Sequence, residues 1–299
     1  MADQSSKIRK RPRWGRRLVW GLVALLLVVG LSNYLTQGKL VGRASKRVAL
    51  LRIQGPILTA GKLVHQIERY GKDSSVRSLV VLVNSPGGGV AASQEIYHAL
   101  LRFRERDKAV VTSMEGVAAS GGYYVALASN KIFANAGTIT GSIGVILQVG
   151  NVEGLLKKVG LKFEVIKSGK HKDIGSPLRP MTPEDRAVVR QLIEDAYNQF
   201  VRAVSEGRDI PVERVRTIAD GRIFSGERAK RLGLVDEVGT LNDAIREAGR
   251  LGGIPGYPVV FEERPLKDWI DRLLGSFWPA GWMADRLSGV GGLQYLWVY

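Results

Sequence analysis

The chain has 299 residues and is 45% hydrophobic, so it can bury at least one sizeable core. It has no cysteine, which excludes disulfides, thiolate metal sites and a cysteine nucleophile. Its formal net charge is +16, but residues 1–17 hold seven basic residues against one aspartate. A basic cluster of this kind suits an anionic membrane surface at least as well as a nucleic acid.

An apolar run follows the basic segment. The 21 residues from 18 to 38 carry no charge, and this is the length that a helix needs to cross a bilayer. A cleaved signal peptide is the alternative, but no Ala-x-Ala-like cleavage site follows Leu31. We therefore predict a cytoplasmic segment at 1–17, a single-pass transmembrane anchor at 18–36 and a linker at 37–46. Because basic flanks stay in the cytoplasm, the remaining chain is expected on the outer face of the cell membrane.

Strand and helix patterns alternate after residue 47. Such alternation is typical of βαβ units with a mostly parallel sheet, and we place this α/β domain at residues 47–250. Buried strands are predicted at 48–53, 78–83, 109–114, 131–133, 143–146 and 163–166, and helices at 62–70, 89–104, 123–129 and 152–159.

Two later helices have clear start signals. Thr182 can cap a long helix in which Pro183 takes the first position and Asp185 meets the free amide groups. Thr240 and Asp243 repeat this pattern before the last helix of the domain.

The tail at residues 251–299 differs in composition from the domain. It holds four of the six tryptophans, and Trp269, Leu273 and Phe277 share an apolar helical face. Such a face packs in a core or a subunit interface, or lies in a membrane interface, and its composition leaves both alternatives open.

Ser120 lies between the strand predicted at 109–114 and the helix predicted at 123–129. At such a turn the hydroxyl can be exposed, with the amide of Gly121 and the positive end of the helix dipole close to a developing oxyanion. The alternative is a helix N-cap, the usual role of a serine before a helix. Ser120 is therefore a candidate nucleophile.

The segment Asn84–Gly89 is a second source of oxyanion donors, directly after the strand predicted at 78–83. Three glycines let backbone amides approach a ligand without a Cβ atom in the way. Residues 87–92 also loosely match a dinucleotide-binding loop. However, Pro86 precedes them, and no acidic residue closes a second strand about 20 residues on. We therefore favour a role in binding an oxyanion.

A serine nucleophile needs a base to take its proton. Of the three histidines, His65 and His98 lie in helical patterns, where surface or packing roles suffice, and His171 lies in a loop. The same loop carries Lys170 and Lys172, and a lysine acts as a base when burial or a cationic neighbour lowers its pKa. Spacing alone does not distinguish His171, Lys170 and Lys172.

Five segments of the chain carry the strongest signal. They are Asn84–Gly89, Ala118–Tyr124, Thr138–Val145, Lys167–Asp173 and Asp220–Glu227. In this order they resemble the motifs of the signal peptide peptidase A family in its short, single-domain form. The resemblance extends from about residue 48 to residue 249. It implies a Clp-protease/crotonase-like α/β fold with repeated ββα and βαβ units.

The resemblance also implies a serine–lysine dyad. Ser120 matches the family's nucleophile, Lys172 its general base, and Ser142 a serine that hydrogen-bonds the lysine. The family further implies a ring-like homo-oligomer in which a neighbouring subunit helps to build each site. The oxyanion donors implied by the match are Gly87, Gly88 and Gly121.

The implied function is that of a membrane-anchored serine endopeptidase that degrades remnant signal peptides and similar short hydrophobic peptides. It requires no cofactor, metal ion or nucleic acid. The alternatives are a crotonase-type acyl-thioester enzyme, which shares the fold and the paired amide donors, and a non-catalytic membrane scaffold. Residues 293–299 are themselves a hydrophobic peptide. If they contact the site, deletion of residues 290–299 changes the peptidase rate.

Overall fold

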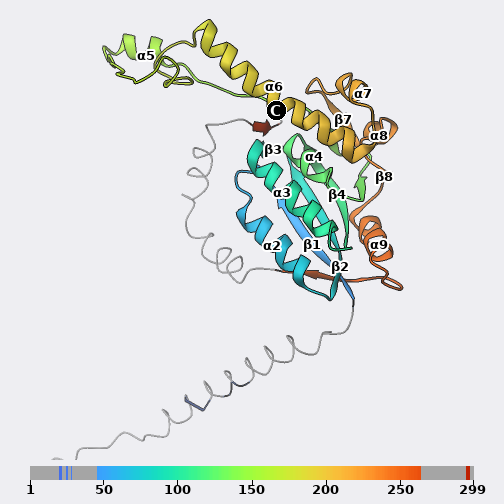
Figure 1. Ribbon diagram of the computed structural model, residues 1–299. Coiled ribbons are helices and arrows are strands. Elements are labelled where there is room, and N and C mark those ends of the chain that lie inside the picture. The colour runs from blue at the N-terminus through green and yellow to red at the C-terminus, as the bar shows by residue number, and fades with distance from the viewer. Residues whose placement is uncertain (1–19, 22–24, 26–27, 29–45, 264–293, 297–299) are drawn as a thin grey trace, which may run out of the picture. The chain divides into compact units, whose positions relative to one another are not determined.

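A mostly parallel sheet forms the centre of the domain (Figure 1). Its central strands are β1 (Arg47–Gln54), β2 (Val76–Ser85) and β4 (Ala109–Ala119), which are largely buried on both faces. Strands covered on both faces are typical of α/β folds, so the predicted class is confirmed. The outer strands are β5 (Lys131–Ala134), β6 (Ile139–Gly141), β7 (Ile223–Ser225), β8 (Glu237–Val238) and β9 (Val259–Glu262). The order is β7-β6-β4-β2-β1-β9, and β5 pairs with β4 and β8.

The computed structural model describes residues 20–21, 25, 28, 46–263 and 294–296. The chain divides into two compact units, and the sheet belongs to the unit that begins at Lys46. Within the described part of the chain, no helix is long and apolar enough to span a membrane. The predicted cytoplasmic segment, nearly all of the predicted anchor and most of the tail lie outside the described residues.

Helices cover both faces of the sheet. α2 (Gly61–Lys72) and α3 (Val90–Arg104) pack on the face that carries Val81, and α9 (Leu241–Leu251) packs on the face that carries Val80. Successive strand residues point to opposite faces, so an uninterrupted apolar strand supplies both cores.

β4 is long enough to pair with two successive strands. Its residues Val111–Met114 lie beside β5, and Val117–Ala119 lie beside β6. All of these strands are parallel, whereas β7 runs antiparallel to β6. The carboxyl ends of β4 and β6 therefore meet at the same edge of the sheet.

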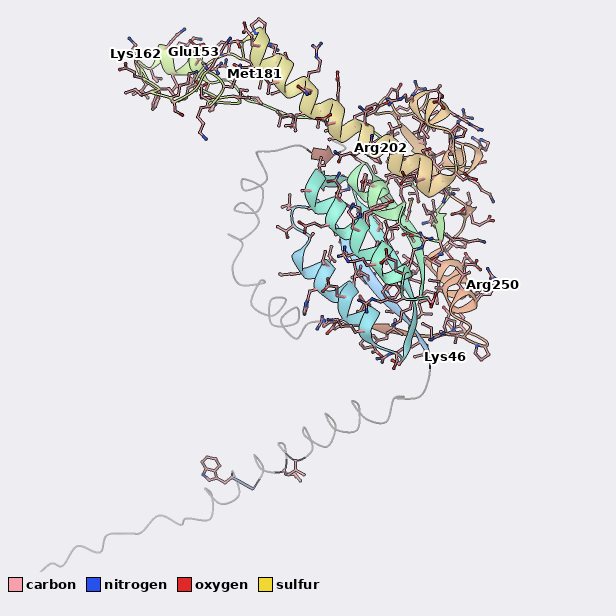
Figure 2. All side chains as sticks on the ribbon, in the orientation of Figure 1. Lys46, Glu153, Lys162, Met181, Arg202 and Arg250 are labelled. Atoms are coloured by element: carbon pink, nitrogen blue, oxygen red, sulfur yellow. The ribbon has the colours of Figure 1, made fainter. Side chains whose placement is uncertain are left out.

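The helix α6 (Pro183–Arg208) packs on the domain only with its C-terminal half, where Phe200 and Val204 are buried. Its other end lies near α5 (Glu153–Lys158), and Figure 2 shows Glu153, Lys162 and Met181 together at that end. We call residues 146–182 the arm. The segment at 152–166 is largely exposed.

The predicted helix starts are confirmed. Thr182 and Asp185 form a reciprocal capping box at the start of α6, and Thr240 and Asp243 form one at the start of α9. Two short helices that the sequence analysis does not predict, α7 (Val212–Arg216) and α8 (Gly226–Arg231), follow α6.

Two strand predictions are wrong. The strand expected at 143–146 lies earlier, as β6, and ends before Ser142. The strand expected at 163–166 does not form, because residues 161–167 pair with no other described segment. An alternating apolar segment becomes a strand only when another strand supplies hydrogen-bond partners, and none of the described strands does so here.

Two later strands place parts of the tail against the domain. β9 pairs with β1, so the sheet continues beyond residue 250. β10 (Gln294–Leu296) pairs antiparallel with β3 (Gly87–Gly89), the glycine segment that the sequence analysis treats as a loop.

Candidate active site

Ser120 occupies a strained turn between β4 and α4 (Gly121–Ala126). Its backbone angles are φ 52° and ψ −116°, and such conformations cost a non-glycine residue roughly 1–3 kcal/mol. Two backbone hydrogen bonds of 2.8 Å hold the turn: the Ser120 amide donates to Gly141, and the Tyr124 amide donates to Ser120. Some hydrolases use a strained strand-to-helix turn to present a nucleophilic serine, so the geometry favours this role.

The Ser120 hydroxyl has no hydrogen-bond partner among the described residues, although the residue is only 1% exposed. It does not cap α4, so the N-cap alternative is not supported. A buried hydroxyl without a partner costs about 1–3 kcal/mol. Ser93 inside α3 shares this property, so the missing partner alone does not identify a nucleophile. The strained turn and the neighbouring amides distinguish Ser120.

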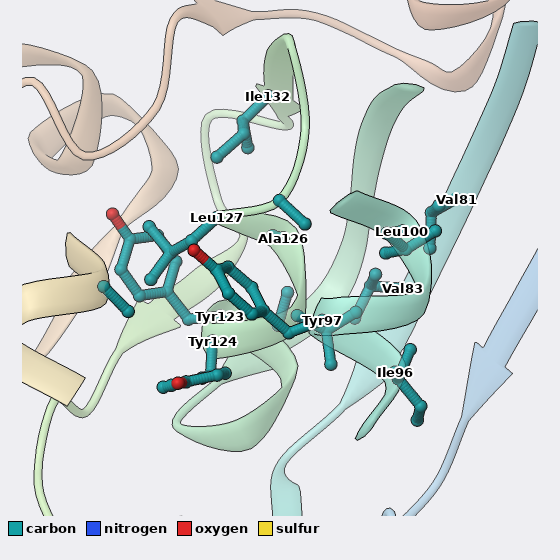
Figure 3. Packing of buried hydrophobic residues seen from close by; sticks show 14 of the residues in the cluster. Val81, Val83, Ile96, Tyr97, Leu100, Tyr123, Tyr124, Ala126, Leu127 and Ile132 are labelled. Atoms are coloured by element: carbon teal, nitrogen blue, oxygen red, sulfur yellow. The ribbon is translucent and has the colours of Figure 1, made fainter. Parts of the chain in front are cut away.

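The helix that follows Ser120 is deeply packed, as Figure 3 shows around Tyr123 and Tyr124. The Tyr123 hydroxyl donates a 2.8 Å hydrogen bond to the carbonyl of Leu234, and the Tyr124 ring meets that of Phe200 edge-on. Burial raises the pKa of Tyr124 to about 12 and also raises the pKa of Tyr123. Both phenols therefore stay protonated at neutral pH, and neither can serve as the base.

Ser142 follows β6 in the same way as Ser120 follows β4. Ala119 lies opposite Gly141 in these adjacent parallel strands, so both serines are at the same edge of the sheet. Ser142 also has a positive φ, 50°, and its amide donates a 2.9 Å hydrogen bond to the carbonyl of Arg222. The structure thus brings together the predicted nucleophile and the serine predicted to bind the lysine.

The glycine strand β3 lies against the backbone of Ile57. A Cβ atom at Gly88 would overlap that backbone, so this position requires glycine. The amide of Gly89 donates a 2.8 Å hydrogen bond to the carbonyl of Ile57. Because successive amides of a strand face opposite sides, the amide of Gly88 faces the edge of β3 that pairs with β10.

The three predicted oxyanion donors differ in their present partners. The amide of Gly87 donates to Oγ of Ser85 at 3.1 Å. The amide of Gly121 belongs to the first residue of α4 and has no acceptor within that helix. The amide of Gly121 is therefore the predicted donor best placed to receive an oxyanion, whereas the amide of Gly88 faces β10 in this structure.

Lys172 lies in the arm and not beside Ser120 of the same chain. Nδ1 of the adjacent His171 is 3.1 Å from Oδ1 of Asp185, at the start of α6. The helix after Ser120 contacts α6 at Phe200 instead. The span from Asp185 to Phe200 is about 22 Å along the helix axis. One chain by itself therefore does not join the predicted base to the predicted nucleophile.

The other candidate bases do not approach the nucleophile either. His171 and Lys170 lie on the same loop as Lys172, while His65 on α2 and His98 on α3 are exposed. None of the candidate bases among the described residues hydrogen-bonds the buried Ser120 hydroxyl.

A cavity of about 640 Å³ opens beside Ser142. The segment after β6 lines it with Val145, and the exposed side of α6 lines it with Ile193 and Tyr197. The charged residues of the lining are Glu194 and Asp220, which are negative, and Arg190, which is positive. The cavity therefore combines an apolar lining with charges of both signs and can receive an apolar segment.

Two side chains that hydrogen-bond predicted site segments were not predicted from the sequence. Ser85 orients the amide of Gly87 and lies within the glycine motif itself. Arg179 bridges Asp173 and Asp185 in the arm. In the sequence, Arg179 lies six residues after Asp173 and six residues before Asp185, and this spacing was the available signal for the bridge.

These elements define a class of chemistry. A buried serine on a strained turn, with backbone amides beside it, can accept an acyl group and stabilise the oxyanion that forms. The part of the chain that the structure describes holds no group of His, Asp or Glu side chains that could bind a metal ion. The fold and site therefore define a serine hydrolase that works by acyl transfer.

Comparisons with known proteins give the family. The Clp protease model matches residues 46–140, and the model of peptidase family S49 matches residues 102–254. A relative from Synechocystis sp., named as a protease, is 43% identical over 84% of this chain and 91% of its own length. One named signal peptide peptidase SppA, from Enterococcus faecium, is 36% identical over 72% of this chain and 66% of its own. Serine protease SPPA of Arabidopsis thaliana is 34% identical over 81% of this chain and 35% of its own.

The chain belongs to peptidase family S49 and is a serine peptidase. The resemblance to the signal peptide peptidase A family is confirmed, and the mixed α/β sheet is consistent with a Clp-protease-like fold. The chain spans about a third of the length of the plant relative.

Proposed function

We propose that this serine peptidase is a membrane-anchored endopeptidase with Ser120 as nucleophile and Lys172 as general base. It cuts short hydrophobic peptides, chiefly remnant signal peptides, on the outer face of the cell membrane. The observation that carries the proposal is the strained turn at Ser120, where a buried hydroxyl without a partner lies next to the amide of Gly121. No metal ion or cofactor takes part.

The proposed chemistry is acyl transfer. The neutral amine of Lys172 takes the proton of Ser120 while Oγ attacks the peptide carbonyl, and the amides of Gly88 and Gly121 stabilise the oxyanion. The lysine then gives this proton to the leaving amine. Water that passes a proton to the same lysine hydrolyses the acyl-enzyme. Ser142 hydrogen-bonds the lysine and directs its amine toward Ser120.

In this proposal a neighbouring copy supplies the lysine, within a ring-like homo-oligomer. Lys172 and Ser120 are far apart in one chain, and this separation supports a site that two copies build together. In the arm, the side chain of Phe163 is 57% exposed and that of Ile166 is 95% exposed. Neighbouring apolar side chains with so much exposed surface are typical of a protein interface. When Lys172 of one copy reaches Ser142 of the next, the segment before this lysine lies at the cavity beside that serine.

A peptide substrate would bind at the edge of β3 in place of β10. In the structure this edge pairs antiparallel with β10, which also contacts α3 and α4. Peptides are often recognised by adding a strand to such an edge, where backbone hydrogen bonds hold them regardless of their side chains. The name of the Enterococcus faecium relative supports signal peptides as the substrate class. The basic segment and apolar run at the start of the chain would hold the domain where such peptides are released.

Two single variants test the dyad. Ser120→Ala and Lys172→Met should each abolish cleavage of a hydrophobic peptide and labelling of the serine by a phosphonate. Wild-type cleavage by either variant would contradict the dyad. Mixed oligomers of the two variants should recover part of the activity, because one copy keeps the serine and its neighbour keeps the lysine. Absence of recovery in verified mixed oligomers would contradict a dyad between copies.

A further inference from the structure

The loop that carries Lys172 is tied to the start of α6 by a buried carboxylate. The side chain of Asp185 is 2% exposed. Its Oδ1 lies 3.1 Å from Nδ1 of His171, and its Oδ2 accepts hydrogen bonds from Nη1 of Arg179 at 2.6 Å and from the amide of Thr182 at 3.1 Å. The residue before Lys172 is thereby connected to a fixed helix terminus.

The residue after Lys172 is tied to the same point through Arg179. Nε and Nη2 of this arginine donate to the two carboxylate oxygens of Asp173, at 2.8 Å and 2.7 Å. Nη1 of the same guanidinium reaches Asp185. Lys167 adds a further hydrogen bond to Asp173 at 2.7 Å. A planar guanidinium that binds two carboxylates in this way fixes the distance between the two carboxylates and their relative orientation.

Both carboxylates stay charged at neutral pH. Hydrogen bonds from Arg179, and then from His171, hold the pKa of Asp185 well below its usual range. Hydrogen bonds from Arg179 and Lys167 do the same for the pKa of Asp173. Both carboxylates therefore remain full hydrogen-bond acceptors for the residues around Lys172 at neutral pH.

Lys172 differs from its two neighbours. Its amide closes a turn with the carbonyl of Gly169, but no described residue hydrogen-bonds or pairs with its ammonium. The remaining charges of this cluster are themselves paired, since Lys170 lies 3.8 Å from Glu184. The structure thus holds the backbone on both sides of Lys172 and leaves its amine free for an external partner.

We propose that Arg179 is a positioning residue, which acts through Asp173 and Asp185 to hold the backbone of Lys172 and deliver its amine to Ser120. The inference rests on the proposed dyad and adds a part of the arm to the machinery of the reaction. A base must lie within hydrogen-bond reach of its proton, and a misplacement of 1 Å can cost about 100-fold in rate. The loop that carries Lys172 lies in a largely exposed arm. It therefore needs hydrogen bonds within the arm and to α6 to hold the lysine amine within reach of Ser120.

Arg179→Gln tests the proposal, with Arg179→Lys as the conservative variant. Each full-length protein is assayed for kcat and KM on a hydrophobic peptide and for the pH dependence of phosphonate labelling of Ser120. We expect Arg179→Gln to lower kcat by about 10- to 100-fold with little change in KM, because the proposed substrate strand binds at β3 and not at the arm. Arg179→Lys should recover part of this loss. Arg231→Gln, which removes an exposed ion pair with Glu227, is the matched control and should behave like the wild type.

The pH profile separates positioning from folding. Labelling of Ser120 by the proposed dyad depends on the placement of the lysine amine, so the pH dependence of the labelling rate in Arg179→Gln should differ from that of the wild type. An unchanged kcat, or a fall in active oligomer with an unchanged pH midpoint, would overturn the proposal and leave Arg179 a structural residue. Retained activity in Lys172→Met would instead refute the dyad itself.

Discussion

The amide of Ser120 donates a 2.8 Å hydrogen bond to the carbonyl of Gly141 and so ties the turn of the nucleophile to the strand that ends at Ser142. Both serines have a positive φ, and both follow parallel strands at one edge of the sheet. The hydrogen bond therefore fixes the position of Ser120, the proposed nucleophile, relative to Ser142, which should hydrogen-bond the lysine. It also stabilises a backbone conformation that Ser120 would not adopt by itself.

Ser120→Ala should abolish cleavage without destabilising the fold. The mutation removes a buried hydroxyl that has no partner, so the free energy of unfolding should stay equal or rise by up to about 2 kcal/mol. Urea denaturation and a peptide assay measure the two effects. Ser93→Ala removes a second buried serine hydroxyl that has no partner among the described residues, and it should keep full activity. A large loss of stability in Ser120→Ala would show that its hydroxyl has a structural partner.

Gly88→Ala should impair both folding and catalysis. The new methyl group would overlap the backbone of Ile57, which should lower the free energy of unfolding by at least about 2 kcal/mol and displace a predicted oxyanion donor. Thermal unfolding and kcat measure the result. Gly61→Ala, at an open position in α2, is the control and should be neutral or slightly stabilising. Wild-type activity in Gly88→Ala would remove this amide from the proposed oxyanion hole.

Cysteine pairs should reveal where the arm of a neighbouring copy lies. The chain has no cysteine, so Phe163→Cys combined with Ile193→Cys places two thiols in an otherwise thiol-free protein. On mild oxidation we expect covalent dimers, because residue 163 of one copy should reach the cavity of the next. Phe163→Cys with Tyr257→Cys controls for random collisions, since Tyr257 is exposed outside the cavity lining. Equal crosslinking of both pairs would contradict the proposed interface.

Deletion of residues 290–299 should raise the rate on short peptides. It removes β10, which pairs with β3 at the edge where we expect a substrate strand, so competition for that edge ends. Steady-state kinetics should show a lower KM. The oligomer should remain, as checked by light scattering. Unchanged kinetics and an unchanged oligomer would show that the tail plays no part in the site.

Asp73 should stabilise the domain in a pH-dependent way. Burial acts to raise its pKa, but hydrogen bonds from Ser75 and Arg47 outweigh burial and lower the pKa from 3.8 to about 2. A depressed folded pKa means that the stabilisation is present above about pH 4 and disappears as pH falls toward 2. After allowance for a side chain that is 35% exposed, Asp73→Asn should cost about 1 kcal/mol at pH 7.

Urea denaturation at pH 7 and pH 2 measures this difference. Most of the difference should disappear at the lower pH, because pH 2 equals the folded-state pKa of Asp73 and about half of the wild-type carboxylate is then protonated. Asp195→Asn, at an exposed position of α6, should show no such dependence. If the difference in free energy of unfolding between the two proteins were the same at pH 7 and pH 2, Asp73 would stabilise the domain through its shape and not through its charge.

Signals that depend on neighbouring residues were predicted well. The apolar runs of β1 and β2 and the capping boxes at Thr182 and Thr240 all formed as expected, because each needs only side chains within a few positions. Signals that depend on distant partners were not. β3 consists of three glycines and is a strand only because Ile57 and β10 supply its partners, whereas 163–166 has strand character and no described partner.

By itself, the sequence determined the candidate chemistry: a serine before two glycines, a glycine loop, and a lysine in a later motif. The tertiary structure decided the strain at Ser120, the order of the strands that places Ser142 beside it, and the separation of Lys172 from Ser120 within one chain. It also placed Arg179 between two aspartates. The physical reason is that residue types carry reactivity, whereas distances between residues far apart in the chain are set by packing and hydrogen bonding of the whole domain.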